Sequence, residues 1–238
     1  MSGVGARRGF GGVRLRGSRA VRALPWRRVS FACIDLETTG LDPRHDAIVS
    51  FGVIPVAGGR VRLDRRRYRL VHPGRPMPSR VVTIHRIRPA DLAEAPPLAA
   101  VEGELRESLR DAVPVAWTSW VEAAFLARAL GGSSRAWEHR IVDVRRLAIA
   151  ADHLAGVEPS PAARESLAAT AERLGVPPDL EHHALWDAFV TAQLFLICAS
   201  RLEAAGRGTV GDLVRLGRGR RVGEVLRPFR VRALSPRG

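Results

Sequence analysis

The segment 31–40 of this 238-residue chain reads FACIDLETTG, an apolar run with two acids near its end. Its composition and the Thr-Thr-Gly turn predict a buried strand that ends near Gly40. Successive side chains on a strand alternate between faces, so Asp35 and Glu37 project on the same side. Two neighbouring carboxylates repel each other unless a cation lies between them. The segment therefore predicts a strand with a cation site at its tip, although the spacing alone fits a solvated surface turn equally well.

The ligands on offer indicate which cation would bind there. Carboxylate oxygens suit hard ions such as Mg²⁺ or Mn²⁺, whereas zinc prefers clusters of cysteine and histidine. The two cysteines, Cys33 and Cys198, lie in apolar runs without a C-x-x-C pattern. We predict that both are buried small hydrophobes, and we expect neither a disulfide nor a zinc site.

The positive charge is concentrated at the two ends of the chain. The net charge is +14; residues 1–30 hold eight Arg and no acid, and residues 207–238 hold nine Arg and two acids. The chain has no Lys, so part of its Arg content reflects the coding bias of a GC-rich genome. Basic ends favour a polyanionic partner, nucleic acid first and an anionic membrane second.

The composition, 46% hydrophobic and 26% charged, predicts one globular domain. We place it at 30–206, between a disordered basic arm at 1–29 and a basic tail at 207–238. A transit peptide or an upstream extension would also explain the arm, and Val210, Leu213, Val222 and Leu226 leave open that the tail joins the core. The apolar stretch 188–199 is too short to cross a bilayer, and we expect a cytoplasmic protein without membrane contact.

Hydrophobic periodicity and turn residues predict an α/β fold around a five-stranded mixed sheet. Three antiparallel strands come first, and two parallel strands that alternate with helices follow. The segment 73–97 is rich in turn residues. The first predicted strand lies within 31–40, and the others are 47–54, 61–71, 113–117 and 141–144. The predicted helices are 98–110, 121–130, a helix after 144, 160–175 and 184–205.

A second chemical cluster opens the last predicted helix, where residues 181–188 read EHHALWDA. This order places an imidazole at the start of the helix and Asp187 one turn inside it.

Together, the DLETTG run at 35–40 and His182-x-Ala184-x-x-Asp187 resemble the first and third motifs of the DEDDh, or DnaQ-like, 3′→5′ exonuclease family. Residues 115–126 align with its second motif, V-A-H-N-A-x-F-D-x-x-F-L, but Trp117 replaces the histidine and Glu122 stands in place of the aspartate. Residues 84–92 are similar to the family segment between the third strand and the first helix.

The resemblance implies an RNase H-like fold that cleaves the terminal phosphodiester with two Mg²⁺ or Mn²⁺ ions. Asp35 would bridge the ions, Glu37 and Asp187 would bind the ion near the nucleophile, and Glu122 would bind the other one, through water. His182 would be the general base. His183 is the residue four positions before Asp187 and shares its helix face, but the family spacing of five favours His182. Substrate contacts are expected from Thr38, Thr39, Gly40, Leu41 and His85, the last of these as a loop histidine and not as a metal ligand.

The function implied is release of nucleoside 5′-monophosphates from single-stranded or frayed 3′ ends, in proofreading or repair. DNA is favoured as the substrate, RNA stays open, and a polymerase is a possible partner. The alternative is a catalytically weakened nucleic-acid-binding or polymerase-associated module whose second motif has decayed. Trp117 and Trp120 fit either the core or a base-stacking surface.

Overall fold

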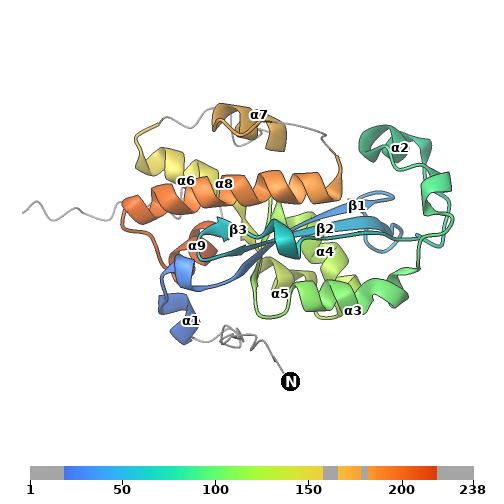
Figure 1. The fold of residues 1–238 in the computed structure, drawn as a ribbon, viewed down its shortest axis with the longest axis horizontal. Helices are drawn as coiled ribbons and strands as arrows, with labels where there is room; N and C mark the ends of the chain where they lie inside the picture. The colour runs from blue at the N-terminus through green and yellow to red at the C-terminus, as the bar shows by residue number, and fades with distance from the viewer. Residues whose placement is uncertain (1–18, 158–165, 178–181, 219–238) are drawn as a thin grey trace, which may run out of the picture.

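A computed structural model describes residues 19–157, 166–177 and 182–218, and within them the chain folds around one mixed sheet (Figure 1). The sheet order is β3-β2-β1-β5-β6, and β4 also pairs with β2. β2 runs antiparallel to β1, β3 and β4, whereas β1, β5 and β6 are parallel. The strands are β1 Phe31–Thr38, β2 Ile48–Ala57, β3 Arg60–Val61, β4 Arg67–Leu70, β5 Val113–Ala116 and β6 Val142–Asp143.

The sheet has six strands and not five, because the strand predicted at 61–71 is broken in two. A 3-10 turn at Leu63–Arg65 separates β3 from β4, and both strands pair with β2. Two contacts of Arg62 stabilise the break: its N–H donates to Pro55 O at 2.8 Å, and its guanidinium pairs with Asp64 at 2.9 Å. The predicted order of antiparallel and then parallel strands is confirmed.

The predicted helices are confirmed near their expected bounds, except that the predicted opening at residue 160 lies outside the described residues. The segment 73–97, predicted as turns, also holds a short helix, α2. The helices are α1 Arg19–Ala23, α2 Ser79–His85, α3 Leu98–Ser108, α4 Ser119–Leu130, α5 Ser134–Glu138, α6 Val144–Leu154, α7 Leu167–Arg173, α8 Ala184–Ala204 and α9 Val210–Leu216, with 3-10 turns at Trp26–Arg28 and Pro89–Leu92.

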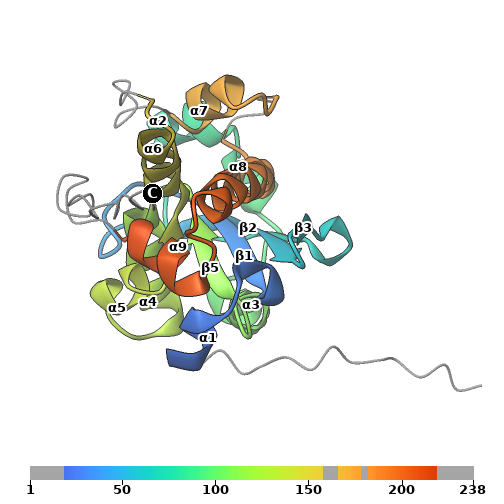
Figure 2. The same ribbon diagram turned by 90° about the vertical axis from the view of Figure 1, so that its left-hand side faces the viewer.

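The helices cover the sheet on both faces, with α8 lying along one face (Figures 1 and 2). Strand alternation divides β1 between two cores. Phe31 and Cys33 pack with α6, α8 and α9, whereas Ile34 and Leu36 pack with α3 and α4. Cys33 and Cys198 are free and buried, as predicted. Because side chains alternate along the strand, Asp35 and Glu37 face the side that α8 covers.

The folded unit extends past the boundaries predicted at 30 and 206. Trp26 is fully buried and meets Phe31 and Phe195 in edge contacts at ring-centroid distances of 6.5 and 5.9 Å. Two backbone hydrogen bonds of 3.0 Å, from Trp26 N to Gly208 O and from Val210 N to Leu24 O, join the two ends of the described chain. Residues 19–29 and 207–218 are therefore part of the core, while 1–18 and 219–238 lie outside the described residues.

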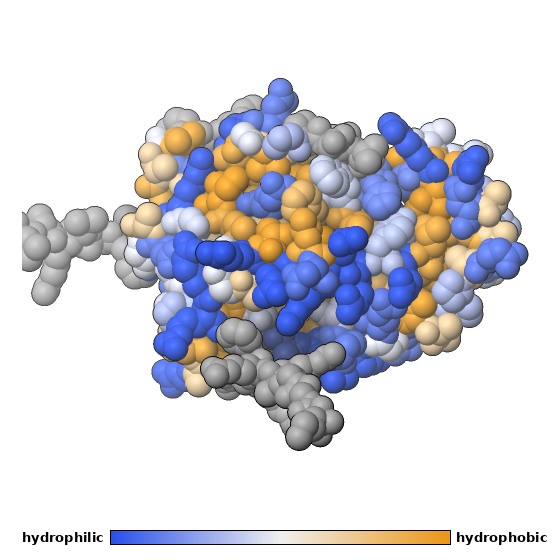
Figure 3. Space-filling model, viewed as in Figure 1, coloured by the Kyte–Doolittle hydropathy of each residue, from blue (hydrophilic) through white to orange (hydrophobic). Residues whose placement is uncertain are grey.

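Helix α8, Ala184–Ala204, extends beyond both ends of the apolar stretch 188–199 that the sequence argument considered. The 21 residues of the whole helix are long and apolar enough to cross a membrane by length and composition alone. Half of its apolar window is nevertheless buried inside the fold, as in the core helix of a soluble protein. The partly buried apolar residues of α8 are Leu185, Trp186, Phe189, Leu196 and Ile197. Figure 3 shows a broad hydrophobic area, in orange, on the face of the molecule viewed in Figure 1.

Candidate active site

A glycine in β2 allows the start of α8 to lie directly on the sheet beside the acidic residues of β1. Asp35 pairs with Gly52 and Glu37 with Ser50 in the antiparallel register. A Cβ added to Gly52 would lie only 2.3 Å from the carbonyl oxygen of Ala184, so no larger residue fits there without moving the helix. Because Gly52 has no side chain, the first turn of α8, which carries Asp187, can pack on the sheet next to Asp35.

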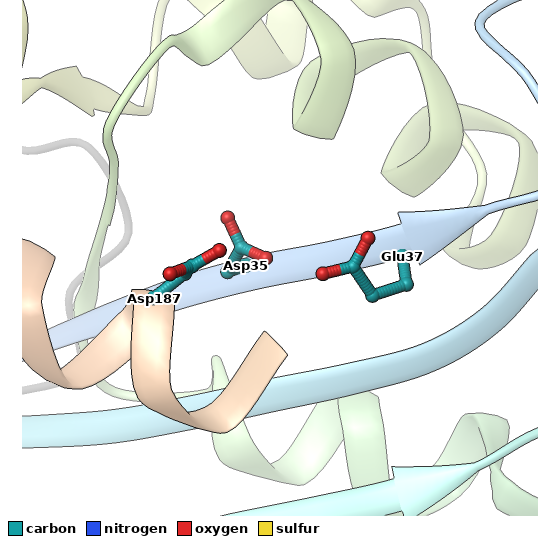
Figure 4. A group of neighbouring side chains, drawn as sticks. All are labelled: Asp35, Glu37 and Asp187. Atoms are coloured by element: carbon teal, nitrogen blue, oxygen red, sulfur yellow. The ribbon is translucent and has the colours of Figure 1, made fainter. Parts of the chain in front are cut away.

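Three carboxylates meet at this junction (Figure 4). Asp35, Glu37 and Asp187 each offer one oxygen, and these oxygens all lie within 4.8 Å of one another. Glu37 and Asp187 are largely buried. Two of the three segments predicted to supply the acids, β1 and the first turn of α8, thus bring their carboxylate oxygens together.

The third segment is the first turn of α4, which carries Glu122. This side chain is buried, and its Oε2 has no hydrogen-bond partner within the described structure. It lies close enough to Asp35 to raise the pKa of that carboxyl. Glu122 is nevertheless outside the group of three oxygens, because it is not among the acids within 4.8 Å of one another.

Burial and mutual repulsion raise the pKa values of these acids. Burial raises the pKa of Glu37 to about 8, with the nearby Asp187 adding to the effect. The pKa of Glu122 is also raised to about 8, mainly by burial and further by Asp143 and Glu37. For Asp35 the pKa lies well above its ordinary value, because of burial and then of Glu37, Glu122 and Asp187. A cation bound among these acids would relieve the repulsion between their charges. Their ligand atoms are all carboxylate oxygens, and such ligands suit a hard divalent ion.

The two histidines before α8 face different surroundings. His182 is exposed, has a left-handed backbone with φ 61°, and its N–H donates to Asp187 Oδ2 at 3.0 Å. His183 is the N-cap of α8, and its ring stacks on Tyr68 of β4 at a centroid distance of 4.7 Å. The pKa of His85 is lowered mainly by its burial and further by the nearby His182. His182 is therefore close to the end of α2.

Four of the five residues predicted to contact substrate, Thr38 to Leu41, form the end of β1 and the start of the loop after it. Thr38 Oγ1 donates to Gly40 O at 2.6 Å, and Thr39 Oγ1 donates to Asp46 Oδ1 at 2.9 Å. Leu41 is 62% exposed at the tip of the loop. The two threonine hydroxyls are thus engaged in closing the loop, which leaves Leu41 as the side chain most open to a ligand.

His85 is buried at the end of α2 and does not lie in a loop, which corrects the sequence expectation. Its Nδ1 accepts from Ile87 N at 3.1 Å, and its Nε2 has no partner within the described residues. Of the two tryptophans, Trp117 is in the core and Trp120 is half exposed in the first turn of α4.

Sequence reasoning missed two side chains that shape the site. Asp143 accepts hydrogen bonds from the backbone N–H groups of Ser119 and Arg146, both at 3.0 Å, and so fixes the starts of α4 and α6. Tyr68 pairs with Gly52 across the other edge of β2 from Asp35, so the strand register places the side chains of Tyr68 and Asp35 on the same face of the sheet. The only available signal for Asp143 was its place between a predicted strand and a predicted helix, which is typical of an N-cap.

Comparison with known proteins places this geometry among nucleases. A sequence model of the RNase T family, described as exonuclease, matches residues 32–195. A DNA polymerase III subunit epsilon-like protein of Rhodobacter capsulatus is 31% identical over 83% of this chain and 28% of its own length. A PolC-type DNA polymerase III of Thermotoga maritima is 29% identical over 79% of this chain and 13% of its own length. The chain therefore spans less than a third of either relative.

Among solved structures, exonuclease X in complex with 5′-overhanging duplex DNA matches with a TM-score of 0.56 and 24% identity. The match covers 79% of this chain and 99% of that one. At this identity the likeness concerns the fold, which is the RNase H-like α/β fold that the sequence predicted.

Proposed function

The chain belongs to this exonuclease family, and we propose that it hydrolyses nucleic acid from the 3′ end with divalent cations bound by Asp35, Glu37, Glu122 and Asp187. The observation that carries the proposal is the convergence of buried carboxylates from β1 and α8, with an exposed histidine hydrogen-bonded beside them. Ordinary structural acids do not gather at such an energetic cost without a ligand.

Metal ions bound at these carboxylates would stabilise the negative charge on the attacking and leaving oxygens at phosphorus. Figure 4 shows the carboxylate of Asp35 between those of Asp187 and Glu37, and Glu122 is also near enough to raise the pKa of Asp35. This position suits a ligand shared by two ions. Glu122 would bind from the α4 side through the Oε2 atom that lacks a hydrogen-bond partner. Its extra methylene, compared with the family's aspartate, lets it reach further from the helix.

His182 would accept a proton from the attacking water. It is exposed, lies outside the helix, and is tied to the acidic group only through its backbone N–H, so its ring is free to approach substrate. Imidazole is the side chain most often used as a general base at neutral pH. The stacking of His183 on Tyr68 engages the neighbouring ring and favours His182 for this role.

Single-stranded or frayed DNA is the substrate that we propose, with nucleoside 5′-monophosphates as products. The relatives named for DNA polymerase III support DNA over RNA and support a setting in proofreading or repair, next to a polymerase. The association with a polymerase is also a proposal, because the chain spans only a small share of the length of these relatives.

The test uses oligonucleotides labelled at either the 3′ or the 5′ end, incubated with Mg²⁺, Mn²⁺ or EDTA. A 3′→5′ exonuclease releases the 3′ label at once as a mononucleotide and shortens the 5′-labelled strand in single steps. Both products should be absent in EDTA. Cleavage from the 5′ end, or cleavage unaffected by EDTA, would contradict the proposal.

Two observations favour a second function: Glu122 lies outside the group of three oxygens, and Trp117 replaces the histidine of the second motif. A chain with this change could bind nucleic acid or a polymerase without efficient cleavage. The same assay separates the two functions, since a binding module retards the oligonucleotide in a gel without shortening it in either metal.

A further inference from the structure

A second concave site lies on the side of the sheet covered by α3 and α4, behind the loop that follows β1. Its volume is about 270 Å³. Its walls come from the end of that loop, the segment after β4, the start of α3 and the last turns of α4, and the lining residues are Asp46, Ala47, Ile48, His72, Pro73, Gly74, Arg75, Pro97, Leu98, Phe125, Arg128 and Ala129. None of the carboxylates of the candidate active site lines it.

The polar groups of this cavity are mainly donors without acidic partners. Arg75 and Arg128 are exposed side chains, and neither forms an ion pair with a carboxylate of the described chain; Arg128 donates to the backbone oxygen of Pro43. His72 accepts the N–H of Gly74 at its Nδ1, at 3.2 Å, which leaves Nε2 as the nitrogen that carries the proton. The cavity thus offers two guanidinium groups and an imidazole to one ligand.

The single acid of the lining is already engaged. Asp46 Oδ1 accepts from Thr39 Oγ1 at 2.9 Å, and Oδ2 accepts from Asp42 N at 2.9 Å. These bonds hold the carboxylate within its own loop, so it does not neutralise the arginines as an ion-pair partner. An anion that enters the cavity would therefore meet an excess of positive charge.

The remaining surface is apolar and suits a flat group. Ile48 and Phe125 are buried side chains whose surfaces form part of the wall, and Leu98 lies beside them. An inorganic anion would leave this apolar surface uncovered. A ligand with a phosphate at one end and a planar, weakly polar ring at the other covers both parts.

We infer that this cavity binds one nucleotide outside the catalytic centre, with its phosphate on Arg75 and Arg128 and its base against Ile48, Leu98 and Phe125. The choice of a nucleotide as the phosphate carrier rests on the proposed function, whereas the preference for a phosphate rests on the lining alone. Two sources share this chemistry: a released mononucleotide, and a nucleotide within a bound strand.

The position of Asp46 links this cavity to the candidate active site. Its carboxylate lines the cavity and also holds Thr39, which directly follows β1 with Asp35 and Glu37. Gly40 packs so closely on Asp46 that an added Cβ would lie 2.4 Å from its Oδ2. An occupied cavity therefore contacts the same loop that carries the expected substrate contacts Thr38 to Leu41.

Isothermal titration in EDTA tests the proposal on the full chain. EDTA removes the cations through which the acidic cluster would bind a phosphate, so that site does not compete. The titrants are inorganic phosphate, deoxyadenosine monophosphate and a deoxyadenosine dodecamer. The variants are R75A/R128A; R60A, which removes an exposed arginine of β3 far along the sheet; and D187N, which alters the acidic cluster.

The wild type should bind the mononucleotide at one site and more tightly than it binds inorganic phosphate. The affinity should fall by about tenfold or more in R75A/R128A, because two charge-assisted contacts are lost, and stay unchanged in R60A and D187N. A dodecamer that binds more tightly than the mononucleotide, with the same dependence on the two arginines, identifies the strand as occupant; equal affinities identify the released product.

Equal mononucleotide affinity in the wild type and R75A/R128A would overturn the inference, as would loss of binding in D187N. The outcome is independent of the nuclease assay. Arginine-dependent phosphate binding in a chain that fails to cleave DNA would refute the proposed function while leaving the cavity as an anion site.

Discussion

The backbone N–H of His182 donates to Oδ2 of Asp187 at 3.0 Å from a left-handed backbone conformation, φ 61°. A non-glycine residue seldom adopts this conformation, and such strain is concentrated at functional sites. The conformation turns the chain sharply before α8 begins. Asp187 extends toward the acidic group from the first turn of α8. His182 precedes this helix and lies close to His85 at the end of α2.

The first prediction follows from this arrangement. His182→Ala should reduce turnover by ~100-fold or more, because general bases contribute on the order of 10²–10⁴ to rate. His183→Ala should have a much smaller effect on turnover, since it removes a stacking contact with Tyr68. Single-turnover rates on a short single strand measure both, and a larger loss in His183→Ala would transfer the role of base to His183.

His182→Asn is the matched control for the backbone. Asparagine tolerates the left-handed conformation and keeps the N–H that binds Asp187. The protein should melt at the same temperature as the wild type and remain as inactive as His182→Ala. If His182→Asn were active, the residue would serve the fold and not proton transfer.

The second prediction concerns the central carboxylate. Asp35→Asn should abolish cleavage, because the amide no longer supplies the charge that holds cations. In EDTA the same variant should be at least as stable as the wild type, since it removes a buried charge repelled by Glu37, Glu122 and Asp187. Thermal unfolding measures the stability, and Asp111→Asn in an exposed turn is the control. Near-wild-type turnover of Asp35→Asn would contradict the assignment.

The third prediction addresses the departure in the second motif. Glu122→Ala and Glu122→Gln should both lose most activity, whereas Glu122→Asp should keep it with an altered preference between Mg²⁺ and Mn²⁺. Mg²⁺ demands a nearly ideal ligand geometry, so a change of one methylene affects it more than Mn²⁺. Rates titrated against each metal test this, and full activity of Glu122→Ala would make the buried acid a structural residue.

The sequence predicted the sheet and the acidic cluster because each depends on short-range patterns. The alternation in β1 fixes where Asp35 and Glu37 point, and the spacing from His182 to Asp187 fixes the start of α8. Two features of the site depend on contacts between distant segments and were missed: the fit of Ala184 on Gly52, and the hydrogen bonds of Asp143 to α4 and α6. No local pattern marks the fit of Ala184 on Gly52, and the only local signal for Asp143 was its N-cap position between a predicted strand and a predicted helix.

The folded unit is longer than the predicted domain 30–206 for a related physical reason. Arginine and glycine around Trp26 and Gly208 look like solvated arms by composition, yet one buried tryptophan and two backbone hydrogen bonds tie both segments to the core. Composition averages over a window, whereas a single large side chain of this kind contributes several kcal/mol.

The fourth prediction is a pH dependence of stability without metal. Glu37 and Glu122 have pKa values raised to about 8 from 4.5, so between these values the folded chain holds more protons than the unfolded chain. The free energy of unfolding contributed by these groups is therefore complete below the unfolded pKa and falls as pH rises through about 8.

In EDTA the melting temperature should thus fall between about pH 5.5 and about pH 8.5, and Mg²⁺ or Mn²⁺ should restore it most at the higher pH, where the ligands are deprotonated. The double variant Glu37→Gln, Glu122→Gln should lose both the pH dependence and the stabilisation by metal. A wild-type melting temperature that rises over this range would contradict the assignment of raised pKa values.

The last prediction concerns the two arginine-rich ends of the chain, which lie outside the described residues. Residues 1–18 hold four Arg and no acid, and residues 219–238 hold six Arg and one Glu. We predict that a chain cut to 19–218 keeps its turnover at saturating substrate but binds single strands more weakly. Contacts of arginine with phosphate release counterions, so the shorter chain should also show a shallower slope of log affinity against log salt. Fluorescence anisotropy at several salt concentrations gives the slopes.

The place of the cut decides whether this experiment is informative. A chain cut to 29–206 would also lose Trp26 and α9, whose Leu213 is fully buried, and it should be destabilised by at least ~3–5 kcal/mol, the cost of removing one large core side chain. Matching melting temperatures of 19–218 and the full chain confirm that only the arms have been removed. Superimposable salt slopes of these two chains would then assign the arginines to coding bias, because the arms would make no phosphate contacts.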